Sequence, residues 1–254
     1  VMGEELTLFR NEAGRLGLLG LRCPHRATDL SYGRVEDGGL RCVYHGWLFD
    51  VDGNCLDQPG EPKGSRFADK IKHLAYPCLE QGGLVFAYMG PGEPPELPSY
   101  ECLNLPVENV LVTKFYHECN YLQGHEGNID PQHLATLHFV LPDEAVASGV
   151  RWDPNGIDVA PRFEVEETDY GIRMYSGRDL GANHDYVRIT NYVYPAAVAF
   201  PALRPPDIEG APIGTAAGAG FYGVNWQVPI DDTHHWKYML LVSPHGPLPK
   251  DRIG

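Results

Sequence analysis

The stretch LRCPHRATDLSYGRVEDGGLRCVYHGW, residues 21–47, decides how the rest of the sequence is interpreted. It contains two short pairs of potential metal ligands, Cys23-x-His25 and Cys42-x-x-His45. Each pair joins one cysteine to one histidine, whereas a zinc finger usually groups its cysteines together and its histidines together. The mixed pairing predicts two metal atoms rather than one.

Two kinds of metal site can use these four residues. A single zinc ion could take all four as a Cys₂His₂ set. In a Rieske 2Fe–2S cluster, two cysteines bind one iron and two histidines bind the other, so each loop supplies one ligand to each iron. Sixteen residues separate His25 from Cys42, and this spacing favours the Rieske cluster over the zinc site. Pro24 and Gly46 suit tight loops, and Tyr44 and Trp47 are placed to cover the metal atoms.

Composition limits the possible classes of protein. The formal net charge is −14, and an acidic chain repels nucleic acid. We find no apolar run long enough to span a membrane and no secretion signal, so we expect a cytoplasmic protein. The 29 glycines and 22 prolines favour short strands and loops over long helices. We expect the other cysteines to be buried as small apolar side chains; they are Cys55, Cys78, Cys102 and Cys119.

Both ends of the chain have the character of internal sequence. The chain starts at Val1 within an apparent strand and stops at PLPKDRIG, which closes no element. We therefore expect the natural protein to be longer than these residues.

The hydrophobic pattern predicts an α+β protein. Hairpins punctuated by Gly, Asn and Asp turns are expected at residues 5–25, 39–57 and 73–90. A Pro-rich, acidic stretch at 90–100 is followed by a strand at 109–120 and a helical pattern at 121–140. Strand-like runs then return, at residues 162–179, 186–201 and 223–244.

A second group of potential ligands lies on the helical pattern, as Asp130-x-x-His133-x4-His138. We expect Asp130 to cap a helix whose first residue is Pro131. Two histidines and one carboxylate are the ligands of many non-haem Fe(II) oxygenases. Taken alone, the two histidines are better explained as core or surface residues. The Rieske pattern upstream changes that balance in favour of an iron site.

These motifs resemble one family. CPHR (residues 23–26) and GLRCVYHGWLFDVDGNC (residues 39–55) resemble the Rieske domain of the α subunits of aromatic-ring-hydroxylating oxygenases. The similarity is to the phthalate dioxygenase group in particular, with its phenoxybenzoate dioxygenases and vanillate O-demethylases. Ala27-Thr28 stands where Gly-Ala is common, a change that we expect to leave the cluster intact. The Asp130 to His138 motif is similar to the family's iron motif.

The resemblance implies two domains. Residues 1–105 would form an all-β Rieske 2Fe–2S domain. Residues 106–254 would form a catalytic domain with a curved antiparallel sheet and helices, which is incomplete here. The cluster would be bound by Cys23, His25, Cys42 and His45.

The resemblance also assigns roles in the second domain. His133 and His138 would bind a mononuclear Fe(II), and Asp130 would carry electrons from a Rieske histidine to His133. The third iron ligand of this family is an aspartate near the C-terminus, and we expect it beyond Gly254. We interpret Asp231 and Asp232, with His234 and His235, as turn or structural residues.

The implied activity is reductive activation of dioxygen and hydroxylation of an aromatic, carboxylated substrate, as in phthalate-like ring dihydroxylation during aromatic catabolism. A monooxygenase or O-demethylase acting on a methoxylated aromatic acid is the alternative. Electrons would come from a separate flavin and iron–sulfur NAD(P)H reductase. The subunits would form a homotrimer or hexamer, in which His45 of one subunit contacts Asp130 of its neighbour.

Two other classes of protein are to be compared with this one. A Rieske electron carrier would need only the first 90 residues or so, and a zinc-stabilised binding protein would have no oxygenase activity. A pocket for a carboxylate needs an arginine or a group of donors. The sequence offers four arginines without singling one out: Arg162, Arg173, Arg188 and Arg204.

Overall fold

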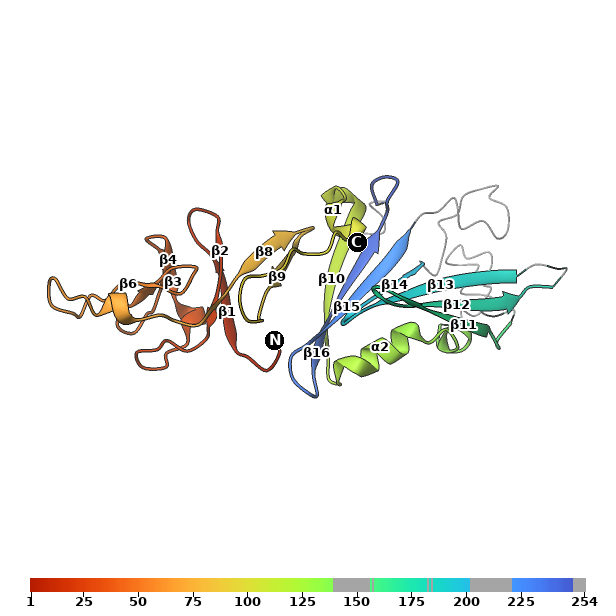
Figure 1. Ribbon diagram of the computed structural model, residues 1–254, viewed down its shortest axis with the longest axis horizontal. Helices are drawn as coiled ribbons and strands as arrows, with labels where there is room; N and C mark the ends of the chain where they lie inside the picture. Colours follow the sequence, from red (N-terminus) through yellow and green to blue (C-terminus); the bar gives the residue numbers. More distant parts are fainter. Residues whose placement is uncertain (139–155, 157, 182, 184, 202–220, 249–254) are drawn as a thin grey trace. The chain divides into compact units, whose positions relative to one another are not determined.

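The computed structural model describes residues 1–138, 156, 158–181, 183, 185–201 and 221–248 (Figure 1). The chain divides into two compact units. The first unit comprises Val1 and Gly3–Asn104, and the second comprises Met2 and Leu105–Gly254. No helix among the described residues is long and apolar enough to cross a membrane.

The first unit is built from short antiparallel strands. One sheet has the order β1 (Leu6–Arg10), β2 (Leu16–Gly20) and β7 (Ala75–Tyr76). A second sheet has the order β3 (Arg34–Glu36), β4 (Gly39–Arg41), β5 (Leu48–Phe49) and β6 (Cys55–Asp57). The hairpin β8 (Cys78–Gln81) and β9 (Leu84–Ala87) follows, then helix α1 (Glu101–Asn104). Two 3₁₀ turns are at Leu30–Tyr32 and Ala68–Lys70.

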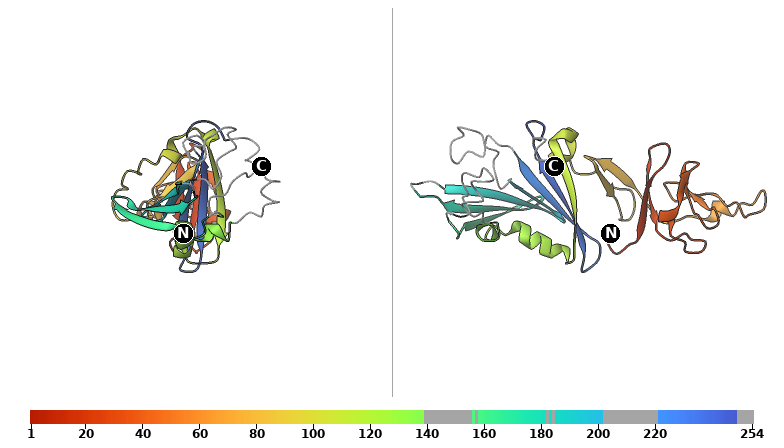
Figure 2. Two further views of the ribbon diagram at one scale, coloured as in Figure 1. Left: turned by 90° about the vertical axis from the view of Figure 1, so that its right-hand side faces the viewer. Right: turned by 180° about the vertical axis from the view of Figure 1, so that it is seen from behind.

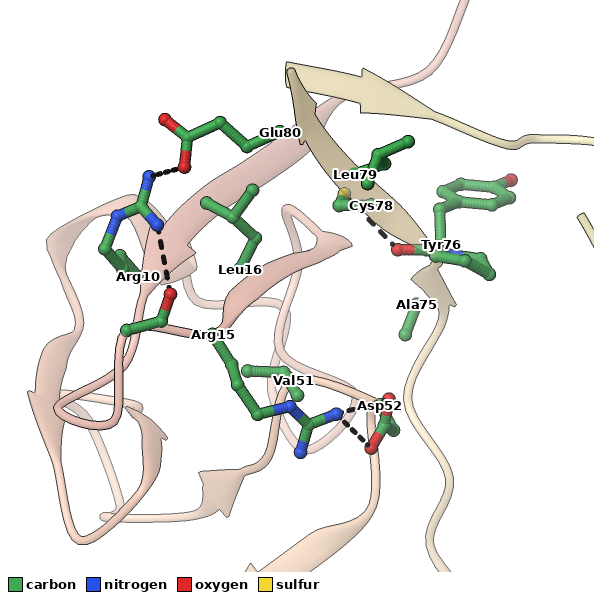
Figure 3. A pocket seen from close by; sticks show the side chains of 12 residues that line it. Arg10, Arg15, Leu16, Val51, Asp52, Ala75, Tyr76, Cys78, Leu79 and Glu80 are labelled. Carbon is green, nitrogen blue, oxygen red and sulfur yellow. Dashed lines mark hydrogen bonds and ion pairs between the residues drawn. The ribbon is translucent and has the colours of Figure 1, made fainter. Parts of the chain in front are cut away.

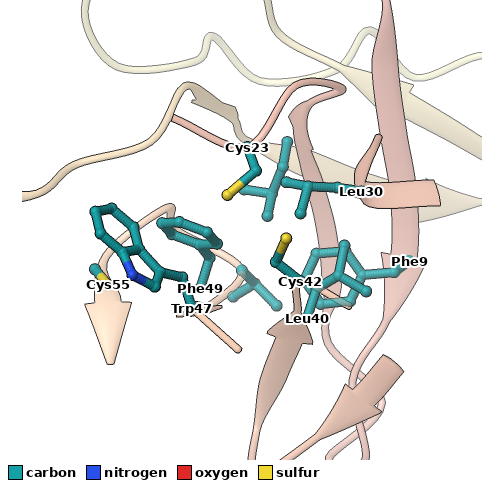
Figure 4. Packing of buried hydrophobic residues seen from close by; sticks show 10 residues of the cluster. Phe9, Cys23, Leu30, Leu40, Cys42, Trp47, Phe49 and Cys55 are labelled. Carbon is teal, nitrogen blue, oxygen red and sulfur yellow. The ribbon is translucent and has the colours of Figure 1, made fainter. Parts of the chain in front are cut away.

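The core of the first unit lies directly beneath the two ligand loops. Leu19, Leu30 and Phe49 are completely buried and belong to one apolar cluster. Cys23 and Cys42 are members of the same cluster (Figure 4). The packing of this core therefore fixes the backbone from which both thiols project.

The second unit is an antiparallel sheet of seven strands with helix α2 (Tyr121–Ile129) against it (Figure 2). A 3₁₀ turn at Val107–Asn109 precedes the first strand. The order across the sheet is β10 (Val110–His117), β16 (His235–Val242), β15 (Tyr222–Pro229), β14 (Ala197–Pro201), β13 (Asp185–Val193), β12 (Gly171–Asp179) and β11 (Arg162–Thr168).

Helix α2 begins and ends for local reasons. The Asn120 side chain accepts a hydrogen bond from the Leu122 N–H, which is a typical N-cap. Gly124 allows the helix to approach strand β15, because a Cβ at this position would lie 2.7 Å from the Gln227 side chain. The helix ends at Asp130, whose extended backbone is the conformation that a following proline favours.

The α+β architecture and the hairpins are confirmed, and the helix expected to begin at Pro131 is wrong, because the residues described directly after Pro131 form a 3₁₀ turn. Pro131 divides the helical pattern into α2 and a 3₁₀ turn at His133–Ala135. Asp130 is the C-cap of α2 and not the N-cap of a helix that begins at Pro131. Its side chain still accepts hydrogen bonds from the N–H groups of Gln132 and His133, as an N-cap would.

Candidate metal centres

The thiols of Cys23 and Cys42 lie side by side in the core of the first unit. Their exposed fractions are 2% and 4%, and both are free thiols that point into the same space (Figure 4). Burial, together with the neighbouring Cys42, raises the pKa of the Cys23 thiol to about 11. Two thiols held together without a disulfide fit a metal site, because a bound cation compensates the charge that burial disfavours.

The imidazoles of His25 and His45 are also paired. Their ring centroids are 4.5 Å apart, and the Trp47 indole stacks in parallel on His25 at 4.6 Å. Nδ1 of His25 is buried and has no hydrogen-bond partner among the described residues. Burial, His45 and Arg26 lower the pKa of His25, so this ring is neutral at pH 7 and its lone pair is available to a metal.

The two ligand loops share one backbone design. In each, the N–H four residues after the cysteine donates to the cysteine carbonyl: Ala27 to Cys23 at 2.8 Å, and Gly46 to Cys42 at 3.1 Å. Both donor residues have a left-handed backbone, with φ of 54° at Ala27 and 75° at Gly46. Ala27 therefore occupies the position equivalent to Gly46, where glycine is free of steric cost.

Arg41 holds the second ligand loop, and the sequence analysis missed it. Its side chain is 11% exposed and forms ion pairs with three carboxylates, of which Asp57 is at 2.8 Å. The same guanidinium donates to the Gly46 carbonyl at 2.7 Å. The partners of Arg41 are Glu36, Asp37 and Asp57. Acidic residues are frequent in this chain, so their presence near the loop does not identify Arg41 as its anchor.

The arrangement of the four side chains favours two metal atoms. Sulfur is next to sulfur and imidazole next to imidazole. In the described part of the chain, no three of these four residues bring donor atoms within 4.8 Å of one another. A single tetrahedral zinc ion would require that convergence, whereas a 2Fe–2S cluster with one iron at each pair does not.

The second group of candidate ligands lies where α2 ends. Asp130 Oδ2 is 3.3 Å from Nδ1 of His133, and the ring centroids of His133 and His138 are 5.0 Å apart. A carboxylate on Nδ1 leaves Nε2 of His133 for a metal, which is the usual second-shell arrangement. The described residues contain no third donor that completes a compact group with the two histidines.

Arg178 of strand β12 holds the turn between Asp130 and His133. Its exposed fraction is 1%, and its guanidinium donates to the Pro131 carbonyl at 2.7 Å. It also donates to the carbonyl of Asp158. These contacts attach the turn that carries the candidate iron ligands to the sheet. They could not be predicted from local sequence, because Arg178 lies 47 residues from Pro131.

Arg188 is a buried arginine that forms no ion pair with a carboxylate of the described residues. Arg188 of strand β13 is 7% exposed, and its Nη1 has no hydrogen-bond partner among the residues described. Its charge is one of the causes that lower the pKa of His138, after burial and His133. Arg162 and Arg173 are more exposed and paired with Asp185 and Glu166, and Arg204 lies outside the described residues.

A cavity of about 460 Å³ in the first unit has a different character (Figure 3). Its two arginines are paired with carboxylates, Arg10 with Glu80 at 2.7 Å and Arg15 with Asp52 at 3.2 Å. None of the candidate metal ligands lines this cavity.

Comparison with known proteins agrees with these observations. Residues 1–80 match the Rieske [2Fe-2S] domain family, and residues 87–245 match the family described as LigXa C-terminal domain like. The Rieske domain indicates a 2Fe–2S cluster.

Named relatives and solved structures agree with the family matches. The phthalate 4,5-dioxygenase oxygenase subunit of Pseudomonas putida is 38% identical over 94% of this chain and 53% of its own length. The 5,5'-dehydrodivanillate O-demethylase oxygenase subunit of Sphingobium sp. is 44% identical over 68% of this chain and 40% of its own length. The crystal structure of dicamba monooxygenase bound to dicamba superimposes with a TM-score of 0.73 and 21% identity, over 97% of this chain and 72% of that one, which shows the shared fold.

The chain spans about half the length of the curated relatives that it matches. Within that span it carries both matched families, and the identity to the phthalate 4,5-dioxygenase oxygenase subunit extends over nearly all of its residues. The chain therefore belongs to the Rieske oxygenase family, among the oxygenase subunits that join a Rieske [2Fe-2S] domain to a LigXa-like C-terminal domain.

Proposed function

We propose that this chain is the terminal oxygenase component of a system that hydroxylates a carboxylated aromatic compound. The observation that carries the proposal is the presence of two separate ligand sets in one chain of this family, one for a cluster and one for a mononuclear iron. A Rieske electron carrier or a zinc-stabilised binding protein would need only the first set.

The ligand roles are part of the proposal. Cys23 and Cys42 bind one iron of the cluster, and His25 and His45 bind the other. His133 and His138 bind the mononuclear Fe(II) in the domain formed by residues 106–254, and a carboxylate is the third ligand. The iron centres, when bound, supply the electrons and the oxygen chemistry.

Asp130 has a positioning role in this scheme. Its carboxylate fixes the tautomer and the orientation of His133 through the contact between Oδ2 and Nδ1. Its side chain is 44% exposed, so the second carboxylate oxygen is accessible to a partner imidazole. We assign that partner to His45 of a neighbouring subunit in a homotrimer or hexamer.

The electron donor is a separate flavin and iron–sulfur NAD(P)H reductase. The run GAGFYG at residues 218–223 has the spacing of a dinucleotide-binding turn. A true fingerprint of this kind opens a helix, whereas Tyr222 begins strand β15. The run therefore gives no support for a nicotinamide site in this chain.

Arg188 supports a carboxylated substrate. A buried guanidinium without a carboxylate is costly, and an anionic ligand would remove that cost. Arginine also matches the planar, bidentate geometry of a carboxylate. The Arg188 charge acts on His138, so a carboxylate bound by Arg188 would bring the attached ring toward the candidate iron ligands.

O-demethylation is the second candidate reaction. The O-demethylase oxygenase subunit from Sphingobium sp. shares 44% identity with this chain, a value above that of the phthalate 4,5-dioxygenase subunit, although over a shorter stretch. Both reactions use the same residues of this chain, so the product distinguishes them.

A single-turnover reaction under oxygen-18 gas tests the proposal. The chemically reduced protein is mixed with phthalates, phenoxybenzoates and methoxybenzoates, and products are identified by mass. Two labelled oxygens in one ring product indicate a dioxygenase, whereas one labelled oxygen or release of formaldehyde indicates a monooxygenase or demethylase. No product from any acid, with both metal sites filled, would refute the proposed substrate class.

Two variants test the assigned residues in the same reaction. Arg188→Met should lower kcat/KM for an acid about 100-fold and leave turnover of the matching amide unchanged, since a hydrogen-bonded charge pair is worth about 1.5–3 kcal/mol. Asp130→Ala should keep both metals bound but stop coupled turnover. Normal turnover by Asp130→Ala would exclude the positioning role.

A further inference from the structure

His117, Cys119 and His235 form a compact group of donors at one end of the seven-stranded sheet. His117 on β10 and His235 on β16 are directly paired across the two strands, so both side chains lie on the same face. Cys119 follows β10 by two residues. One donor atom from each of the three side chains lies within 4.8 Å of the others, and no other such group occurs in the described part of the chain.

The three side chains lie in close contact. Sγ of Cys119 is 3.9 Å from Nδ1 of His235, and the imidazole centroids of His117 and His235 are 4.8 Å apart. One metal ion can therefore reach a donor atom of each side chain.

His235 is the most unusual member of the group. It is completely buried, and its Nε2 has no hydrogen-bond partner among the residues that the structure describes. Its Nδ1 donates to the Cys119 carbonyl at 2.9 Å, so Nε2 carries the lone pair. Metal-binding histidines commonly donate their second N–H to a backbone carbonyl in this way. An orphaned buried acceptor costs free energy that a bound cation would offset.

The group is distinct from the iron sites described above. His117, Cys119 and His235 lie on or beside strands β10 and β16, and none of them is a candidate ligand of the cluster or of the mononuclear iron.

We propose that His117, Cys119 and His235 bind a zinc ion, as a third metal site separate from the cluster and the mononuclear iron. Two nitrogens and one thiolate are borderline-soft donors that zinc accepts, whereas magnesium and calcium require oxygen ligands. Three protein ligands leave a fourth position for water. The zinc ion would fasten the end of β10 to β16, next to the start of α2.

Metal counting on the iron-loaded protein tests this site. The protein is treated with a mild chelator, mixed with equimolar zinc, desalted and measured by inductively coupled plasma mass spectrometry. The wild-type protein should retain zinc in a ratio of one per chain at unchanged iron content. Cys119→Ser and His117→Ala should each lose the bound zinc on desalting, while Cys78→Ser, which changes another half-buried thiol, should retain it.

Cobalt gives an independent readout that does not depend on activity. Co²⁺ in the site should produce a thiolate-to-metal charge-transfer absorption that Cys119→Ser abolishes, with the cluster absorption unchanged. Retention of zinc by Cys119→Ser at the wild-type level would overturn the proposal, as would a wild-type protein that retains none. Loss of the bound zinc in His133→Ala but not in Cys119→Ser would instead place it at the iron site and would equally overturn it.

Discussion

The ligand loops of the first unit and the segment 130–138 of the second unit hold their candidate ligands in different ways. Cys23 and Cys42 are buried in an apolar core, and matching backbone hydrogen bonds close both loops. Asp130 and His133 have side chains that are 44% and 26% exposed, and they lie between α2 and a 3₁₀ turn. The first site is formed by the folding of its own unit, whereas the second requires another donor to be complete.

This difference predicts how strongly each metal is bound. In the first unit, the apolar core holds the two thiols and the His25 ring in place. At the second site, one carboxylate and one buried arginine position the turn, and the described residues provide no third donor. We therefore expect the cluster to be coupled to the stability of its unit, and the mononuclear iron to bind more weakly.

The largest expected effect is the loss of the cluster in Cys42→Ser. A serine hydroxyl does not replace a thiolate as an iron ligand, so the visible absorption and the acid-labile sulfide should disappear. His133→Ala is the matched variant in the second unit, and it should keep the colour while losing only the mononuclear iron. A coloured Cys42→Ser protein, or a colourless His133→Ala protein, would contradict the assignment of the two sites.

Arg41→Met should have the next largest effect, because it removes the hub of the second ligand loop. Three carboxylates and the Gly46 carbonyl would lose a buried partner, and we expect the free energy of unfolding to fall by about 3 kcal/mol. Denaturant unfolding followed by cluster absorption measures this change.

Arg34→Met is the control for Arg41→Met. Arg34 also pairs with Glu36, but its side chain is 57% exposed. Exposed ion pairs contribute little, so this change should alter the free energy of unfolding by about 0.5 kcal/mol or less. Equal effects of the two substitutions would show that Arg41 acts only through surface charge.

His125→Leu should stabilise the second unit by about 2 kcal/mol at pH 7. His125 is 4% exposed on α2, and neither ring nitrogen has a hydrogen-bond partner within the described ranges. Burial, with a smaller contribution from His235, lowers its pKa to about 4. A leucine fills the same space without a buried, unpaired N–H group.

The pH dependence of stability gives a second measurement on His125. In the unfolded chain His125 binds a proton below pH 6.5, whereas in the folded chain it does so only below about pH 4. Its contribution to stability is therefore complete above pH 6.5 and is lost as the pH falls from 6.5 to about 4, by at most about 3 kcal/mol. Thermal unfolding over this range should be flatter for His125→Leu. His245→Gln changes an exposed histidine and should leave the profile unchanged.

Features formed by residues close together in the sequence were predicted best. Each Cys and His pair lies within four residues, and the turns of the hairpins contain their own glycines, so the first unit could be inferred segment by segment. A helix was expected from Pro131 onward because the apolar spacing continues past it, whereas the restriction that Pro131 places on Asp130 ends helix α2 there.

Features that depend on distant residues had no sequence signal. Arg178 reaches Pro131 from 47 residues away, and His117 meets His235 only through the register of β10 and β16. Arg188 differs from Arg162 and Arg173 by its burial, which the sequence does not display. The candidate iron site, which is assembled between elements, was accordingly less predictable than the cluster site.

Ala27→Gly should have the smallest effect, and it compares the two ligand loops directly. A left-handed backbone costs an alanine about 1 kcal/mol, so glycine stabilises the folded loop. Glycine also gives the unfolded chain more conformational freedom, which offsets part of this effect. We therefore expect a net stabilisation of about 0.5 kcal/mol. Gly46→Ala is the reciprocal change and should destabilise, because φ is 75° and a Cβ would lie 3.0 Å from Pro59. Urea unfolding of both variants measures the pair. Opposite signs would establish that the two positions are equivalent, and a destabilised Ala27→Gly would show that the loops differ in backbone strain.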